Sequence, residues 1–311
     1  MTVTADELPP GLVAQAELGP DWADWLDRLP RLASDLLGDW DLGRDGATLW
    51  HGFESLVIPV RDSAGGEAVL KVAFDGDDEG VHEALGLQHW GGRGAVTLMR
   101  ADPRRRALLL ERLERHDLTG VDDLEACTVV GELYGRLHIP APRRLATLTS
   151  YVQRWIDALA DVPRDAPIPR RLVEQALSLG RDLVADASSI GVMIHGDLHH
   201  ENVLRRGGSE WVIIDPKPLS GDAHYEPAPM LWNHLDTHGR RDVREVVRAR
   251  FHTIVDGAGL DPDRARDWVI VRMILNAHWA IEDAERMSRA LTSSEREWIT
   301  TCIAVAKAVM D

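Results

Sequence analysis

Cysteine is nearly absent from this sequence, and long apolar runs are missing altogether. Only two of the 311 residues are cysteine, Cys127 and Cys302, and both lie in segments with helical spacing. This argues against a disulfide-stapled fold or a cysteine zinc site and favours a reducing compartment. No run approaches the roughly 18 apolar residues of a membrane-spanning helix, and the N-terminus lacks the basic flank and apolar stretch of a signal peptide. We therefore expect a cytoplasmic protein with no membrane partner.

Positive charge is also in short supply. The chain has 35 Lys and Arg residues against 51 Asp and Glu residues, a formal net charge of −16. Such a surface repels phosphate backbones, which argues against nucleic acid as a general partner, and it attracts cations. Excess acid is also a common solubility feature, so the charge favours a cationic small-molecule substrate only weakly. A monomer is the default expectation.

The first third of the chain predicts an antiparallel sheet preceded by helices. Apolar positions at helical spacing run from about 18 to 42, where Pro30 predicts a break or a helix start. After this segment the patterns predict strands at 47–50, 55–61 and 68–74, a helix at about 78–90, and strands at 96–99 and 107–113.

The rest of the chain is mainly helical in pattern. The expected helices are 124–138, 145–160, 170–187, 241–255, 261–290 and 294–310. A strand-rich stretch at 192–215 interrupts them and contains a hairpin with its turn at 206–209. We therefore expect an α+β protein with an N-terminal lobe at 1–113 and a helical catalytic and substrate-binding lobe at 114–311.

The interrupting stretch gathers acidic and histidine side chains in one short loop. It reads His195-Gly196-Asp197-Leu198-His199-His200-Glu201-Asn202, and Asp215 follows at the end of the hairpin. The five-residue spacing from Asp197 to Asn202 is that of a kinase catalytic loop, where Asp accepts the hydroxyl proton and Asn holds Mg²⁺. Asp215 is in place to supply the second metal ligand. The three histidines also raise the alternative of a zinc site, but His-Glu-x-x-His spacing and a nearby cysteine are both missing.

The N-terminal lobe offers residues for the nucleotide. Lys71 lies in the third expected strand, where kinases place the lysine that contacts the α- and β-phosphates. We expect Glu83 to pair with it, with Glu79 as the competitor, and Ser55 to assist backbone amides at the phosphates. The backbone near Glu111 and Leu113 is the expected contact for the base. The loop before Ser55 has one glycine rather than Gly-x-Gly-x-x-Gly, which argues against a protein kinase.

Together these residues resemble the aminoglycoside phosphotransferase family, in its streptomycin 6-phosphotransferase and hydroxyurea phosphotransferase branch. The matching segments are 54–60, 90–96, 108–113, 195–204, 211–219 and 279–283. The resemblance implies a bilobal protein-kinase-like fold and ATP with Mg²⁺, with GTP not excluded. It further implies transfer of the γ-phosphoryl group to a hydroxyl of an antibiotic, which confers resistance. Asp197 is then the base, and Asn202 and Asp215 are the metal ligands.

The acceptor site is predicted less directly. Trp232, Asn233, Glu282 and Asp283 lie in segments that match the family, and Glu201 is a further candidate for holding a cationic substrate. An exposed acidic helix face that pairs with Arg286 explains Glu282 and Asp283 equally well. Streptomycin or a related aminoglycoside is the first expectation for the acceptor, and hydroxyurea or a sugar-like metabolite is the alternative. A nucleotide-binding protein without turnover would not need Asp197.

Overall fold

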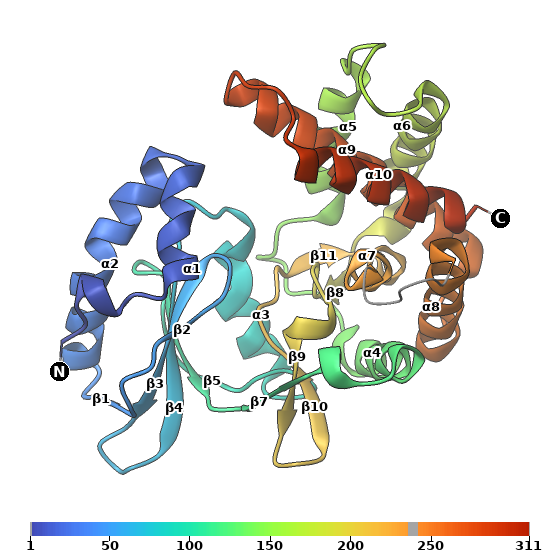
Figure 1. Ribbon diagram of the computed structural model, residues 1–311. Coiled ribbons are helices and arrows are strands. Elements are labelled where there is room, and N and C mark those ends of the chain that lie inside the picture. The colour runs from blue at the N-terminus through green and yellow to red at the C-terminus, as the bar shows by residue number, and fades with distance from the viewer. Residues whose placement is uncertain (1, 236–241, 311) are drawn as a thin grey trace. The chain divides into compact units, whose positions relative to one another are not determined.

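The computed structural model describes residues 2–235 and 242–310, and the chain divides into two compact units (Figure 1). Unit 1 comprises Met1–Arg115 and Arg205–Lys217, and unit 2 comprises His116–Leu204 and Pro218–Asp311. The segment after residue 204 therefore groups with the N-terminal part of the chain. Within the described ranges, no helix is long and apolar enough to cross a membrane.

Unit 1 is built around an antiparallel sheet ordered β1-β3-β4-β6-β5, with β2 on β3. Its strands are β1 (Gly43–Arg44), β2 (Trp50–His51), β3 (Ser55–Arg61), β4 (Glu67–Ala73), β5 (Leu98–Asp102) and β6 (Ala107–Glu111). Asp62 closes the β3–β4 turn because its carboxylate accepts the N–H groups of Ala64 and Gly66. The register places Lys71 between Val57 and Leu108, in the middle of the sheet.

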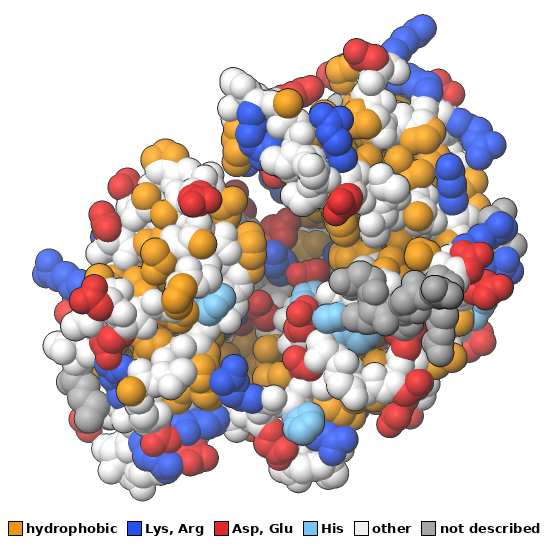
Figure 2. Space-filling model, viewed as in Figure 1, with side chains coloured by type: hydrophobic (Ala, Val, Ile, Leu, Met, Phe, Trp, Pro, Cys, Tyr) orange, Lys and Arg blue, Asp and Glu red, His pale blue; other side chains and the backbone are white. Residues whose placement is uncertain are grey.

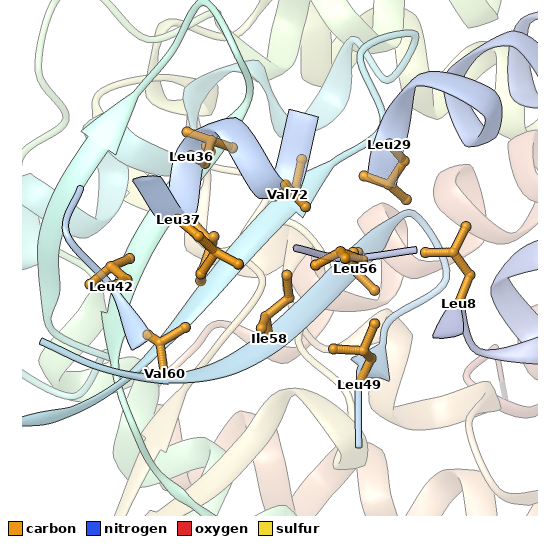
Figure 3. Close-up of a cluster of buried hydrophobic side chains, with 14 of the residues drawn as sticks. Leu8, Leu29, Leu36, Leu37, Leu42, Leu49, Leu56, Ile58, Val60 and Val72 are labelled. Carbon is orange, nitrogen blue, oxygen red and sulfur yellow. The ribbon is translucent and has the colours of Figure 1, made fainter. Parts of the chain in front are cut away.

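The core of unit 1 lies between this sheet and the N-terminal helices α1 (Pro10–Val13) and α2 (Pro20–Asp39). Figure 3 shows Leu29, Leu36 and Leu37 of α2 facing Leu56 and the other labelled strand residues. Helix α2 runs unbroken through Pro30, so the expected break there is wrong. Proline lacks only one donor, and Ser34 gives the Pro30 carbonyl a side-chain hydrogen bond at 2.8 Å.

Unit 2 is a helical assembly. Its helices are α4 (Asp123–Leu137), α5 (Leu148–Ala160), α6 (Arg170–Ala185), α7 (Ala228–Trp232), α8 (Val243–Ala258), α9 (Pro262–Arg286) and α10 (Ser293–Ala308). Helices α9 and α10 pack side by side, as do α4 with α8 and α5 with α6 (Figure 1). The expected helices therefore form, with ends displaced by a few residues.

Short strands frame the expected catalytic loop. Strand β8 (Val192–Ile194) leads into it and pairs antiparallel with β11 (Leu219–Gly221). A 3₁₀ turn, η6 (His200–Asn202), ends it, and β9 (Val203–Arg206) and β10 (Glu210–Ile213) form the expected hairpin. The sequence reading missed β7 (Glu114–Asp117), which joins that hairpin in a sheet ordered β10-β9-β7. A polar strand such as β7 has no apolar alternation to reveal it.

Candidate active site

Hydrogen bonds within unit 2 hold successive backbone groups of the loop from His195 to Asp197. Glu226 accepts the N–H groups of His195 at 3.0 Å and Gly196 at 2.8 Å. Asp197 donates its N–H to His195 Nδ1 at 3.1 Å and accepts the Asn202 side-chain amide at its carbonyl at 2.9 Å. Gly196 has φ of 86°, a region that glycine adopts without steric cost. The loop is therefore preorganised before any ligand binds.

Glu226 is the carboxylate at the centre of this arrangement. It is 1% exposed and follows the short turn η7 (Ala223–Tyr225). Burial acts to raise its pKa, but His138, at 3.7 Å, the charge of His195 and the Gly196 N–H outweigh burial and hold the pKa below its usual value. Glu226 therefore serves the loop as an ionised acceptor.

Arg272 of α9 holds the next peptide unit of the same loop. Its Nη2 donates to the Gly196 carbonyl at 2.6 Å and lies 3.9 Å from a carboxylate oxygen of Asp197. The guanidinium lies over the rings of Tyr225 and Trp232, with centroid distances of 4.4 and 5.3 Å. Trp232 is thus an immediate neighbour of the loop's arginine.

The remaining loop residues fix the orientation of Asn202. Its side-chain nitrogen makes the bond to the Asp197 carbonyl and lies 3.0 Å from His199 Nε2. Because the nitrogen makes these contacts, the side-chain oxygen is the atom that Asn202 can offer to a cation. The carboxylate of Asp197 is 29% exposed, so it is accessible at the loop surface.

In unit 1, Lys71, Glu83 and Asp215 form a compact charged cluster. Lys71 Nζ donates to both carboxylate oxygens of Glu83, at 2.7 and 2.8 Å, and to Asp215 at 2.5 Å. Glu83 opens helix α3 (Glu83–Trp90) and is buried, whereas the Asp215 side chain is 44% exposed. Asp215 has φ of 54°, in the left-handed region that few non-glycine residues adopt. This backbone conformation accompanies the contact with Lys71.

Burial and the neighbouring charges shift the pKa values of Lys71 and Glu83 in opposite directions. Burial alone would lower the pKa of Lys71, but the carboxylates of Asp215 and Glu83 raise it above its usual value. Burial raises the pKa of Glu83 to about 7, against the effect of the Lys71 ammonium. Lys71 is therefore a fixed positive charge in the sheet, paired with Glu83 and Asp215.

Glu79 has a different partner. It lies in the 3₁₀ turn η3 (Glu79–His82), and its carboxylate accepts from Lys217 at 3.1 Å. Lys217 also lies 3.6 Å from Glu54, which precedes Ser55. Ser55 is buried, and its carbonyl accepts the Gly52 N–H at 3.0 Å, which closes the loop between β2 and β3. Lys71 thus pairs with Glu83, and Glu79 pairs with Lys217.

Glu111 is engaged within unit 1 by both its backbone and its side chain. Its N–H donates to the Thr97 carbonyl at 3.0 Å, and its carboxylate accepts the Thr97 N–H at 2.6 Å and forms an ion pair with Arg206. The Glu111 amide is therefore already used at the end of β6. Leu113, two residues further on, lies beyond the strand.

The candidate acceptor residues fall into two groups in unit 2. Asn233 lies 2.8 Å from His200 Nδ1 and donates to Glu201 at 3.5 Å. Asn233 and Glu201 therefore form the first group, at the loop, together with Trp232. A hydrogen bond from His199 lowers the pKa of Glu201 to about 2, and its side chain is 52% exposed. Glu282 lies near His278, and Asp283 pairs with Arg286 at 2.8 Å. Ten residues separate Glu282 from Arg272, about 15 Å along a helix.

Sequence reasoning missed Glu226 and Arg272. Each is a single charged residue beside an apolar run: Glu226 precedes Pro-Ala-Pro-Met-Leu-Trp, and Arg272 interrupts Val269–Leu275. Charged residues in such runs are rarely buried without a specific partner, which is the signal that was available.

Comparison with known proteins places the chain in a family. The family model described as aminoglycoside/hydroxyurea antibiotic resistance kinase matches residues 39–284. The chain belongs to this family. A streptomycin 6-kinase of Streptomyces glaucescens is 37% identical over 294 residues, covering 89% of this chain and 92% of that protein. A hydroxyurea phosphotransferase of Kitasatospora aureofaciens is 35% identical over 275 residues, covering 84% and 76%.

A solved structure supports the same assignment at the level of the fold. A spectinomycin phosphotransferase in complex with ADP and spectinomycin matches with a TM-score of 0.60 at 12% identity, covering 90% of this chain and 98% of that one. The expected α+β, protein-kinase-like fold is thereby confirmed, as is membership of the family. As a member of this kinase family, the protein is a phosphotransferase.

Proposed function

We propose that the protein transfers the γ-phosphoryl group of ATP to a hydroxyl of streptomycin or a related aminoglycoside, in the presence of Mg²⁺. The observation that carries this proposal is the preorganised loop around Asp197 in a chain that is 37% identical to a streptomycin 6-kinase. Phosphoryl transfer requires positioning and charge neutralisation more than covalent chemistry.

Asp197 is the residue proposed to act on the acceptor. Its exposed carboxylate orients the acceptor hydroxyl and takes its proton as the hydroxyl oxygen forms a bond to the γ-phosphorus. The bond between that phosphorus and the β,γ-bridging oxygen breaks, and ADP leaves with the electron pair. The rigid backbone on both sides of Asp197 keeps the carboxylate in one direction for this step.

The donor atoms in each unit fit a hard divalent cation. Asn202 offers an amide oxygen and Asp215 a carboxylate, and Mg²⁺ prefers such oxygen ligands. When bound, Mg²⁺ neutralises charge on the phosphate oxygens. Lys71, held by Glu83, supplies a fixed positive charge for the nucleotide phosphates, with the Ser55 loop as a further contact. The backbone at Leu113 and the carbonyl of Glu111 are the proposed contacts for adenine or guanine.

Acidic and aromatic side chains support a cationic acceptor. Glu201 carries an exposed carboxylate beside the loop, Asn233 donates to it, and Trp232 lies against Arg272. In the view of Figure 2, Asp and Glu side chains are spread over both units, in keeping with the net charge of −16. Asp283, in contrast, pairs with Arg286 and is the weaker candidate. The hydroxyurea phosphotransferase relative supports hydroxyurea as a second candidate acceptor.

The test is coupled ADP release with ATP or GTP and Mg²⁺, across streptomycin, other aminoglycosides, hydroxyurea and simple sugars. Stimulation by streptomycin, with a phosphorylated product identified by mass spectrometry, supports the proposal. Turnover of hydroxyurea or a sugar alone replaces the proposed acceptor and keeps the chemistry. A preparation that binds ATP but releases ADP with none of these acceptors contradicts the proposed substrate class.

A substitution at Asp197 tests the mechanism. Loss of a general base slows reactions by about 10²–10⁴-fold, so Asp197→Asn should lose turnover to that degree and keep its affinity for ATP. Asp182→Asn, at an exposed position of α6, is the matched control and should behave as wild type. Turnover by Asp197→Asn within threefold of the control would rule out the proposed base.

A further inference from the structure

We propose that Arg272 is a positioning residue for phosphoryl transfer, which holds the Gly196–Asp197 segment so that the carboxylate of Asp197 faces the acceptor. This inference rests on the proposed function, because it assigns Arg272 a role in the action of Asp197. The observation behind it is an arginine, 7% exposed, whose shortest hydrogen bond goes to a loop carbonyl rather than to a carboxylate.

Two other arginines of unit 2, the buried Arg250 and the half-buried Arg264, are paired with acids at short distances. Arg250 lies 2.7 Å from Asp123, and Arg264 lies 2.6 Å from Asp222. The carboxylate within ion-pair range of Arg272 is that of Asp197, at 3.9 Å, and the charge of Glu226 also acts on the guanidinium. Burial of a guanidinium without a close ion pair costs free energy, so a purely structural role explains Arg272 poorly.

The long ion pair suits a carboxylate that must take a proton. In a short bidentate pair with arginine, both carboxylate oxygens would be occupied by N–H donors. At 3.9 Å the charge of Arg272 still attracts the carboxylate, but Asp197 keeps its lone pairs for the acceptor hydroxyl. Arg272 therefore directs the side chain without blocking it.

The Gly196 peptide is fixed from two sides. In the peptide unit that joins Gly196 to Asp197, the carbonyl accepts from Arg272 at 2.6 Å and the N–H donates to His195 Nδ1 at 3.1 Å. A peptide plane held at both polar groups cannot rotate without breaking one of these bonds, and its rotation would change the φ angle of Asp197. Small displacements of a reacting group are costly, since an error of about 1 Å can reduce the rate 10²-fold.

Two aromatic rings keep the guanidinium in place. Tyr225 and Trp232 contact it through their faces, as Arg often does with aromatic side chains. Trp232, which the sequence suggested as an acceptor contact, therefore also acts through Arg272. A lysine at position 272 would keep the charge but lose the planar group that these rings hold and the second N–H donor toward Tyr225.

The test compares Arg272→Lys and Arg272→Gln with Arg264→Lys and Arg264→Gln. Arg264 lies on the same helix two turns earlier, and its partners are Asp222, Asp186 and Ser189. For the acceptor that the wild type phosphorylates, we expect kcat to fall at least tenfold in Arg272→Lys and further in Arg272→Gln. KM for ATP and for the acceptor should stay within twofold. The Arg264 variants should lower the thermal midpoint and leave kcat unchanged.

Hydrogen exchange of the loop provides a readout that needs no acceptor. In the peptide covering 193–203, we expect backbone amides to exchange at least tenfold faster in both Arg272 variants than in the Arg264 variants. Unchanged exchange in the folded Arg272 variants overturns the proposal, as does a kcat equal to that of the Arg264 variants. An effect on KM alone also overturns it and makes Arg272 a binding residue. Failure of the proposed function would appear separately, as full activity in Asp197→Asn.

Discussion

The substitution Glu226→Gln tests the electrostatics of the loop most directly. The carboxylate of Glu226 is 1% exposed and accepts the N–H groups of His195 and Gly196 through its two oxygens. Glutamine has the same shape but offers one oxygen, so its NH₂ group must face one of the two N–H donors. One charge-assisted hydrogen bond is lost and one buried N–H is left without an acceptor.

These two losses set the expected size of the effect. A hydrogen bond to a charged group contributes about 1.5–3 kcal/mol, and an unsatisfied buried donor costs about 1–3 kcal/mol. Glu226→Gln should therefore lower the free energy of unfolding of unit 2 by about 2.5–6 kcal/mol, a large part of the roughly 5–15 kcal/mol of a typical domain. Because the same N–H groups fix the loop, kcat should also fall at least tenfold in protein that is fully folded.

Urea denaturation at pH 7, followed by tryptophan fluorescence and far-ultraviolet circular dichroism, measures the first effect. Glu174→Gln is the control, because it makes the same chemical change at an exposed residue of α6 that pairs with Arg170. A surface pair of this kind contributes at most about 1 kcal/mol. If Glu226→Gln lies within 1 kcal/mol of Glu174→Gln, the carboxylate is not what satisfies the loop, and the argument is refuted.

Three further substitutions test other parts of the structure. Glu83→Gln removes one of the two oxygens that hold the buried ammonium of Lys71 in strand β4. KM for ATP should therefore rise about tenfold, which corresponds to roughly 1.4 kcal/mol of binding free energy. An unchanged KM would count against a role of Glu83 in holding Lys71. Burial acts to raise the pKa of Asp222, but its hydrogen bonds are stronger and lower the pKa to about 2. Asp222→Asn should therefore reduce the free energy of unfolding at pH 7 by about 2 kcal/mol. The difference in free energy of unfolding between the wild type and Asp222→Asn must shrink as the pH falls below 4 towards 2, because the wild-type carboxylate then takes up its proton. Urea titrations at several pH values measure it, and a constant difference would mean that the pKa of Asp222 is not lowered. A Cβ added at Gly131 would lie 3.3 Å from the Gly257 backbone, so Gly131→Ala should destabilise the protein by about 1–3 kcal/mol. The control Gly135→Ala adds a methyl group in open space on the same helix and should not destabilise it. Equal thermal midpoints for the two variants would contradict this packing.

The parts of the molecule that sequence predicted are those governed by local rules. Strand β3 formed at 55–61 as expected, because β-branched residues and a turn sequence specify a hairpin locally. The spacing of Asp197 and Asn202 is likewise a property of one short loop, in which the Asn202 amide reaches back to the Asp197 carbonyl. Pro30 shows the limit of such rules, since α2 continues through it where packing against the sheet outweighs one lost donor.

The sequence could not predict which distant backbone groups the buried charged side chains would bind. Glu226 binds N–H groups 30 and 31 residues before it, and Arg272 binds a carbonyl 76 residues before it. Backbone groups are the same at every residue, so no spacing or residue type marks which of them a buried charge will hold. The visible sign is the charge itself, placed in an apolar run where burial is costly unless a specific partner exists. In a chain of this family, such isolated charges next to the proposed catalytic loop are therefore the residues to substitute after the motif residues themselves.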